Sequence, residues 1–381
     1  MEPKIRFKGF EGEWKTPSIG DVFELRNGYT PSKIVKEFWE GGTIPWFRME
    51  DIRMNGGFLK DSLQHITPLA VKGAGLFEKR SIILATTATI GVHAMLIADS
   101  LANQRFTNFK VRKSLSDEYI DEFIYYSFFK IDEWSKNNTN SGGLLSVNMP
   151  LLVKQGFLTP CKEEQQTIAS YFRILDAKLH ASTKKVESLK KLKSASLVAM
   201  FPQQGETTPK VRFKGFEGEW KRHTLYDVLK INSGKDYKHL ESGNIPVYGT
   251  GGYMLSVNDS LSNLDAIGIG RKGTIDKPQY LKAPFWTVDT LFFLTKKNND
   301  NLFFLYNLVQ NINWKKYDES TGVPSLSKNN MERVEIHMPN LAEQQAIATF
   351  FRSLDRKIAL ETARLEKLKQ IKQACLDKMF V

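Results

Sequence analysis

The sequence predicts an α+β protein in which two mixed α/β domains are joined by two long helices that form an antiparallel coiled coil. Three observations predict this fold. The chain contains two copies of one unit, each copy ends in a long helical segment, and the middle of each copy holds apolar, β-branched runs bounded by Gly, Asn and Asp. The duplication implies an internal repeat related by a pseudo-two-fold axis.

Two blocks of sequence mark the ends of the repeated unit. PKIRFKGFEGEWK near the N-terminus returns as PKVRFKGFEGEWK from Pro209, with Ile5 and Val211 as the only difference. EQQTIASYFRILDAKL, from Glu164, returns as EQQAIATFFRSLDRKI, from Glu343. The middles between these blocks differ in length and sequence, which is expected of one frame that holds two different binding domains. A duplication whose halves diverged without selection is the alternative.

The second block of each copy begins a long amphipathic helix. Apolar residues recur there at intervals of three, four and seven, and lysines occupy the opposite face. A helix of this size is ~55–60 Å long and needs an equally long partner, for which its own twin is the obvious candidate. The residues expected to pair the helices are Leu175, Leu179, Val186, Leu189, Leu192, Leu354, Ile358, Leu365, Leu368 and Ile371. The expected divisions are a first mixed domain at 1–161, a helix at 162–202, a linker and second mixed domain at 203–341, and a helix at 342–381.

Composition points to a nucleic-acid partner. The 381 residues include 54 Lys and Arg against 42 Asp and Glu, a formal charge of +12, together with 25 Phe, 12 Tyr and 7 Trp. A basic, aromatic-rich surface suits a polyanion, although a basic surface without a partner would have the same composition. Cys161 and Cys375 fit no metal or redox spacing, and we find neither a signal peptide nor a membrane span. A cytoplasmic location is therefore expected.

Loops in the middles supply candidate DNA contacts. In the second copy Arg271, Lys272 and Thr274 stand in a turn flanked by glycines, which let a backbone approach a phosphate or a groove. The matched loop of the first copy offers the hydroxyls of Thr87 and Thr89 instead, so the two loops cannot read the same bases. The other candidates are Trp46, Arg48, Asn103, Gln104, Arg105, Ser141 and Gly142 in the first copy, and Lys235, Tyr237, Lys238, Tyr248, Ser320 and Thr321 in the second. For each residue taken singly, an ordinary surface or turn position is the alternative.

Catalytic motifs are missing from the sequence. The six histidines form no metal-binding spacing such as H-E-x-x-H, and the chain has no phosphate-binding G-x-x-x-x-G-K-[ST] loop, G-x-S-x-G elbow or Asn-Pro-Pro-aromatic motif. We therefore expect neither catalytic residues nor a bound metal. A nuclease or a methyltransferase with disguised motifs is one alternative, and a structural coiled-coil scaffold without sequence-specific DNA binding is another.

Two variable domains, each followed by the long helix with the E-Q-Q-x-I-A-x-x-[YF]-F-R-x-L-D-x-K-[LI] block, resemble the DNA-specificity subunit of a type I restriction-modification enzyme. The GRKGTI stretch from Gly270 and the run from Phe285 to Leu291 also resemble that family's target-recognition domains. The resemblance implies that each domain reads one half of a split, asymmetric site in double-stranded DNA. It further implies that the helices set the gap between the halves and dock two methyltransferase subunits.

The same resemblance implies that the methyltransferase partners bind S-adenosylmethionine and modify adenine, while this chain binds no cofactor. Motor-nuclease restriction subunits can join for cleavage. Because the family's base-contacting residues differ from member to member, the loop residues are carried over only as candidates. The recognised bases and the length of the gap do not follow from the sequence.

Overall fold

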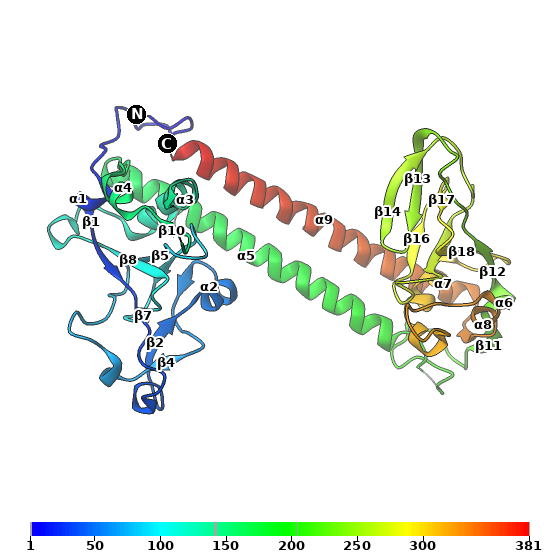
Figure 1. The fold of residues 1–381 in the computed structure, drawn as a ribbon. Helices are drawn as coiled ribbons and strands as arrows, with labels where there is room; N and C mark the ends of the chain where they lie inside the picture. Colours follow the sequence, from blue (N-terminus) through cyan, green and yellow to red (C-terminus); the bar gives the residue numbers. More distant parts are fainter. Residues whose placement is uncertain (1, 141–142, 204, 381) are drawn as a thin grey trace. The chain divides into compact units, whose positions relative to one another are not determined.

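The computed structural model describes residues 2–140, 143–203 and 205–380. It divides into two compact units: unit 1 comprises Met1–Ala181 and Leu365–Val381, and unit 2 comprises Ser182–Arg364. Each unit therefore joins one mixed domain to parts of both long helices, which are α5 (Lys162–Ala199) and α9 (Leu341–Met379) (Figure 1). The expected α+β architecture with two repeats is confirmed. Throughout the described part of the chain, no helix combines the length and hydropathy of a membrane span.

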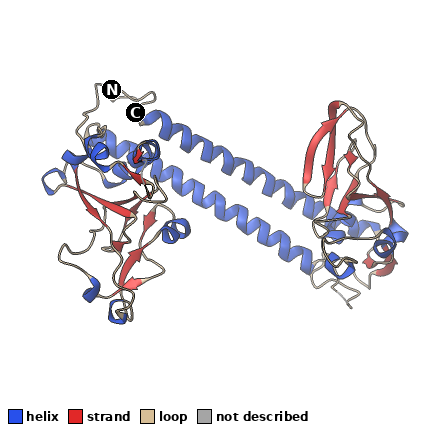
Figure 2. Cartoon of the chain, viewed as in Figure 1, coloured by secondary structure: helices blue, strands red, loops and turns tan. Residues whose placement is uncertain are grey.

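Unit 1 is built on a mixed sheet with the strand order β1-β8-β5-β6-β3. A second sheet has the order β4-β2-β7, and β9 pairs with β10. Strands are drawn in red in Figure 2. The strands are β1 Phe23–Asn27, β2 Ile44–Phe47, β3 Phe58–Leu59, β4 His65–Ile66, β5 Ile82–Ala85, β6 His93–Leu96, β7 Leu101–Ala102, β8 Phe106–Val111, β9 Thr139–Asn140 and β10 Ser146–Val147. The helices besides the long ones are α1 Ile19–Val22, α2 Met49–Asn55, α3 Asp121–Asn137 and α4 Met149–Lys154.

Unit 2 repeats this plan with a four-stranded sheet in the order β12-β18-β15-β16, a sheet β14-β13-β17 and a pair β11-β19. The strands are β11 Lys221–Thr224, β12 Leu229–Ser233, β13 Ser242–Gly249, β14 Gly252–Val257, β15 Ala266–Gly270, β16 Gln279–Leu281, β17 Trp286–Thr287, β18 Leu291–Lys296 and β19 Glu335–Met338. The short helices are α6 Leu225–Val228, α7 Leu302–Gln310 and α8 Lys328–Glu332.

The main strands of the two units correspond. The order β1-β8-β5-β6 matches β12-β18-β15-β16, with antiparallel pairing throughout, and the parallel pair β2–β7 matches the parallel pair β13–β17. The units differ most in the segment directly after the first strand of the parallel pair. Helix α2 comes after β2 in unit 1, whereas the hairpin of β13 and β14 occupies this place in unit 2.

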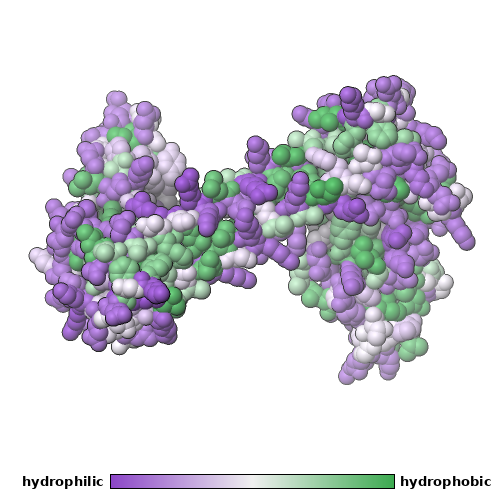
Figure 3. Space-filling view, turned by 180° about the vertical axis from the view of Figure 1, so that it is seen from behind, coloured by the Kyte–Doolittle hydropathy of each residue, from purple (hydrophilic) through white to green (hydrophobic). Residues whose placement is uncertain are grey.

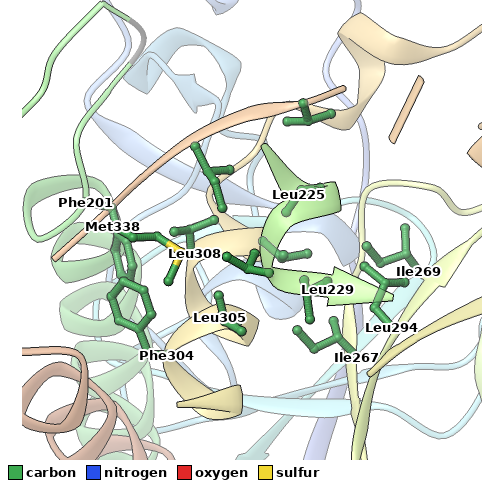
Figure 4. Close-up of a cluster of buried hydrophobic side chains, with 14 of the residues drawn as sticks. Phe201, Leu225, Leu229, Ile267, Ile269, Leu294, Phe304, Leu305, Leu308 and Met338 are labelled. Atoms are coloured by element: carbon green, nitrogen blue, oxygen red, sulfur yellow. The ribbon is translucent and has the colours of Figure 1, made fainter. Parts of the chain in front are cut away.

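Each unit has one large core cluster to which both long helices contribute. In unit 2, Phe201 after α5 belongs to the same cluster as Leu225, Ile267 and Phe304 (Figure 4). Phe351 from α9 is also a member of this cluster. In unit 1 the corresponding cluster includes residues of α5 and the last turns of α9. Burying a large apolar side chain contributes about 1.5–3 kcal/mol. The helix ends are therefore part of the domains that they connect.

Buried ion pairs hold the opening block of each repeat. Arg6 donates two hydrogen bonds to the Glu164 carboxylate, at 2.8 and 2.7 Å, and Arg212 does the same to Glu343, at 2.6 and 2.7 Å. The side chains of Glu164 and Glu343 are only 1% and 0% exposed. A buried carboxylate needs such a partner, which explains why both the arginine and the Glu-Gln-Gln motif are repeated.

The glutamine after each of these glutamates ties the long helix to the domain. The Gln165 side chain accepts a hydrogen bond from the Ile120 N–H at 2.9 Å, directly before α3. Gln344 accepts one from the Asn301 N–H at 3.0 Å, directly before α7. Both repeated blocks are therefore structural.

In unit 1, α5 and α9 run antiparallel. Lys372 forms an ion pair with Asp176 at 2.6 Å, and the Tyr171 hydroxyl lies 3.3 Å from the Cys375 Sγ. Asp176 also accepts a hydrogen bond from Tyr126 of α3 at 2.9 Å. Position increases along α5 as it decreases along α9, and the pairing is anchored to the mixed domain.

Unit 2 shows the same arrangement. Lys193 forms an ion pair with Asp355 at 2.6 Å, and Lys185 lies 2.6 Å from Glu361. Lys193 and Asp355 stand in the sequence repeat where unit 1 has Lys372 and Asp176. The pairing contacts thus occur at equivalent positions of the two sequence repeats.

The prediction that Leu192 and Ile371 belong to the pairing face is wrong, because their side chains are 50% and 37% exposed. The residues of the pairing face instead alternate at intervals of four and three along each helix. On α5 the residue after Leu189 is therefore Lys193, and on α9 the residue after Leu368 is Lys372. Of the other predicted members, Leu175, Val186, Leu354 and Leu365 are buried and Leu179, Leu189, Ile358 and Leu368 are half-buried. Ser182 and Glu361 are also buried on this face, which no apolar stripe could have indicated.

Candidate nucleic-acid interface

In unit 1 the loop after β5 is fixed by backbone hydrogen bonds to two neighbours. The Thr86 N–H donates to the Arg105 carbonyl at 2.9 Å, and the Thr86 carbonyl accepts from the Val147 N–H at 2.8 Å. The Ala88 N–H donates to the Leu145 carbonyl at 2.9 Å. The loop therefore lies between the residues that precede β8 and the strand β10.

In unit 2 the loop after β15 makes the corresponding bonds. The Arg271 N–H donates to the Thr290 carbonyl at 2.8 Å, and the Arg271 carbonyl accepts from the Leu326 N–H at 2.9 Å. The Gly273 N–H donates to the Pro324 carbonyl at 2.8 Å. The loops are alike at one further position, because Gly273 and its counterpart Ala88 both have positive φ angles, of 94° and 66°. This conformation is uncommon for a residue with a Cβ, so the loop of unit 1 is held in place by its surroundings.

Next to the loop of unit 2 lies a polar groove of about 630 Å³. Its walls include Arg271, Lys272, Asp289 and Glu319, so charges of both signs face the opening. Arg271 and Lys272 are exposed, and no carboxylate of a described residue lies within the 4.0 Å of an ion pair from either one. The guanidinium of Arg271 rests over the Phe292 ring, 5.9 Å from its centre. Two cations are therefore available to a ligand here.

The hairpin of unit 2 adjoins this loop. Gln279 donates to the carbonyl of Gly249 at 2.9 Å and so fixes the turn between β13 and β14. A Cβ on Gly273 would lie 3.9 Å from the Thr250 hydroxyl, which places the turn beside the loop. Beyond the turn, Tyr253 is 63% exposed. Aromatic and cationic side chains thus lie on neighbouring segments, as in many nucleic-acid-binding surfaces.

A second loop of unit 2, at 318–325, is ordered by one carboxylate. Asp318 accepts hydrogen bonds from the Ser325 N–H at 2.9 Å and from the N–H and hydroxyl of Ser320 at 3.0 and 2.9 Å. These hydrogen bonds lower the pKa of Asp318 below its ordinary value, and the bond from the Ser325 N–H has the largest effect. A bridge between Lys272 and Ser325 joins this loop to the first. The structure therefore brings together Arg271, Lys272 and the 318–325 loop.

Of the candidates in unit 1, Trp46 is a core residue. Its side chain is only 2% exposed, and its Nε1 donates to the Tyr29 carbonyl at 3.0 Å, so the prediction that it contacts DNA is wrong. Arg48 directly precedes α2, with its guanidinium 6.0 Å from the centre of the Trp46 ring. Asn103 caps its own turn by accepting from the Arg105 N–H at 3.0 Å. The side chains of Thr87, Thr89 and Asn103 are half-buried, whereas those of Gln104 and Arg105 are exposed.

The remaining candidates of unit 2 border the same region. The Lys235 carbonyl accepts from Trp286 Nε1 at 2.9 Å, which matches the bond of Tyr29 in unit 1. Tyr237 and Tyr248 are half-buried against the second core cluster, and Lys238 is exposed. Thr274 and Ser320 are half-buried and Thr321 is exposed. Ser141 and Gly142 lie outside the described residues.

Sequence reasoning missed the second member of each loop contact. The Thr86 N–H donates to the Arg105 carbonyl, and the Thr290 carbonyl accepts from the Arg271 N–H. Asp289 lines the groove of unit 2. None of Thr86, Thr290 and Asp289 was among the candidates. They become visible only when the pairing of β5 with β8 and of β15 with β18 is known. The signals in the sequence were the similarity of IILATTATIG to IGIGRKGTID, which includes Thr86, and the family resemblance of the run from Phe285 to Leu291, which includes Asp289 and Thr290.

Both units have more basic than acidic residues. The residues of unit 1 include 27 Lys and Arg against 23 Asp and Glu, and those of unit 2 include 27 against 19. On the face drawn in Figure 3, hydrophobic residues are interspersed with hydrophilic ones. Among the described residues, no group of three or more His, Cys, Asp or Glu side chains is placed to hold a metal ion.

The family model of the type I restriction modification DNA specificity domain matches residues 11–191 and 217–370, one copy in each repeat. The chain belongs to this family. The specificity subunit of the type I restriction enzyme EcoprrI from Escherichia coli is 31% identical over 382 residues, covering 96% of this chain and 92% of that protein. The specificity subunit of the enzyme MjaVIII from Methanocaldococcus jannaschii is 21% identical and covers 96% of this chain and 91% of its own.

Solved structures of the family share the fold. The S subunit of the type I restriction-modification system from M. genitalium superposes with a TM-score of 0.67 at 19% identity, covering 100% of this chain and 99% of that one. Because the superposition covers the whole of this chain, the shared fold includes both repeats and both long helices.

Proposed function

We propose that this chain is the sequence-specific DNA-binding subunit of a type I restriction-modification complex, and that it supplies recognition without catalysis. One observation carries the proposal: the two units share the same backbone bonding around the loops after β5 and β15, yet present different side chains there. A shared frame with different reading residues suits a site whose two halves have different sequences.

In this proposal, α5 and α9 form one antiparallel coiled coil that sets the gap between the two half-sites. Ion pairs of matching kind in both units, Lys372 with Asp176 and Lys193 with Asp355, support a single register. The alternation of four- and three-residue steps along the buried face is typical of coiled coils. Two readers on such a spacer reach successive turns of the duplex on one side, about 34–36 Å apart.

The same helices would dock two methyltransferase subunits, which bring S-adenosylmethionine and the chemistry. Apolar side chains outside the pairing face support a docking role, since Ile174 of α5 and Leu360 of α9 are 54% and 62% exposed. Restriction subunits would join this complex when cleavage is needed. The chain itself would hold no cofactor.

The decisive experiment is selection of bound duplexes from a random DNA pool, using the full-length chain assembled with the methyltransferase subunits of its system. We expect a split motif with two different halves and a fixed gap. Affinity should fall linearly with the logarithm of salt concentration, because phosphate contacts release counterions. A folded complex that enriches no motif would refute the proposal and favour the structural scaffold.

A further inference from the structure

In each unit, a threonine and an arginine lie opposite each other at the start of the loop, but the two residue types exchange places between the units. In unit 1 the Thr86 N–H donates to the Arg105 carbonyl, and in unit 2 the Arg271 N–H donates to the Thr290 carbonyl. The first loop thus carries threonine in unit 1 and arginine in unit 2. The residue directly before the neighbouring strand, β8 in unit 1 and β18 in unit 2, is arginine in unit 1 and threonine in unit 2.

The register of the sheets makes this correspondence firm. Leu84 of β5 pairs with Thr107 of β8, and Ile269 of β15 pairs with Phe292 of β18. Two residues further along, just beyond the ends of these strands, the same register places Thr86 opposite Arg105 and Arg271 opposite Thr290, where each pair shares one backbone hydrogen bond. Each arginine therefore belongs to the same cross-strand pair of its unit, but to opposite members of that pair.

Opposite members of a cross-strand pair point to the same face of the sheet, with Cβ atoms ~4.5–5.5 Å apart. An arginine side chain is longer than this separation. Its guanidinium can therefore reach the same point in front of the sheet from either member. This geometry allows each unit to present one planar guanidinium group at a corresponding place, from opposite sides of the pair.

Both guanidinium groups are available for such a contact. Arg105 and Arg271 are exposed, and within the described ranges neither forms an ion pair with a carboxylate. The threonines are engaged differently: Thr86 is buried, and its hydroxyl lies 3.0 Å from that of Thr107. Thr290 is half-buried, so in each pair the arginine is the more exposed member.

We infer that Arg105 and Arg271 are the equivalent base-reading residues of the two units, and that each contacts a guanine at the corresponding position of its own half-site. The arginine fork matches the O6 and N7 acceptors of guanine in the major groove, the commonest specific contact between proteins and DNA. The inference rests on the proposed function, because it names the base that the reading surface selects.

The first test compares the motifs selected by the full-length complex carrying Arg105→Ala or Arg271→Ala with that of the unchanged complex. Each variant should lose preference for one G·C pair in one half-site only, by about 5- to 150-fold, the discrimination of a bidentate contact. The removed guanines should stand at corresponding positions of the two halves. Lys60→Ala in unit 1 and Lys230→Ala in unit 2 remove exposed charges elsewhere and should leave both motifs unchanged.

The second test exchanges the pair in unit 2. Arg271→Thr combined with Thr290→Arg reproduces the order of unit 1, and this variant should regain the guanine preference that Arg271→Ala loses, at the same position. Motifs unaffected by either alanine change, or a preference that the exchanged pair moves to another position, would overturn the inference while leaving DNA recognition intact. If the unchanged complex selects no motif, the proposed function fails and the inference fails with it.

Discussion

At the scale of single residues, the chain repeats its buried polar contacts more faithfully than its surface. The same ion pair forms in both units, between Arg6 and Glu164 and between Arg212 and Glu343. Each arginine also donates hydrogen bonds to two backbone carbonyls of its opening block. A glutamate in this position is stable only with its partner, because an unpaired buried charge is costly. The repeated opening block is thus explained by one ion pair.

Replacing Arg6 with Ala should destabilise unit 1, and Arg212→Ala should do the same to unit 2. Each change leaves a buried carboxylate unpaired, which costs about 3–5 kcal/mol. Urea unfolding of the full-length chain measures the loss. Adding Glu164→Gln to Arg6→Ala should recover part of the stability, and Lys8→Ala, at an exposed neighbour, should change little. Equal stability of the Arg6→Ala and Lys8→Ala chains would contradict this account of the opening block.

The 318–325 loop should loosen in acid. Hydrogen bonds from Ser325 and Ser320 lower the pKa of Asp318, so its stabilising effect is fully present above the ordinary aspartate pKa of about 3.9 and is lost as pH falls through the lowered pKa. Hydrogen exchange of the Ser320 and Ser325 amides, corrected for intrinsic rates, should therefore accelerate in that range. Asp318→Asn keeps a carbonyl acceptor without the titration, and its protection should not depend on pH. Protection that fades equally in both chains would refute the role of the carboxylate.

At the scale of elements, the long helices were predictable because periodicity, length and the absence of Gly and Pro agree. Their partner face was predictable only in part. Leu192 and Ile371 fit a three-residue step in sequence, but pairing requires the alternation of three and four, which places Lys193 and Lys372 on the face. The prediction of a DNA contact for Trp46 was wrong for a different reason, because the burial of a strand residue depends on which other segments cover the strand. No local pattern shows that.

Lys193→Glu should destabilise the pairing of α5 with α9 in unit 2 by at least about 1 kcal/mol. The change removes the ion pair with Asp355 and places two carboxylates together in a partly buried position. Adding Asp355→Lys restores opposite charges and should recover the stability, as thermal unfolding would show. Lys191→Glu changes the same charge at an exposed position outside the pairing face. A loss as large in Lys191→Glu would mean that net charge, rather than pairing, sets the effect.

At the scale of the whole molecule, the sequence repeats and the compact units do not coincide. The repeats were visible in the sequence, and with them the α+β class and the two matched loops. The sequence did not show that each unit takes its core from both long helices. Phe201 belongs to the core of unit 2 but follows α5, which begins in unit 1, and Phe380 belongs to the core of unit 1 but follows α9, which begins in unit 2. Contacts between distant segments set that boundary.

Inserting one heptad after Thr183 and another after Arg364 should lengthen the gap in the selected DNA motif and leave both half-sites unchanged. These points lie between the Asp176–Lys372 and Lys193–Asp355 pairs, so both pairs keep their partners. Seven residues add about 10 Å of helix, or roughly two to three base pairs. An insertion in α5 alone shifts one helix against the other and should weaken binding. A motif with its original gap would refute the spacer role of the helices.

The division of the chain into units also determines the order of events during synthesis. The Ile5 N–H donates to the Lys378 carbonyl at 3.0 Å, and Leu376, Met379 and Phe380 belong to the core of unit 1. Unit 2 is one continuous run of residues, so it is complete before the last turns of α9 have been made. Unit 1 therefore lacks the part of its core that residues 376–380 supply until these residues are made, whereas all residues of unit 2 are present by then.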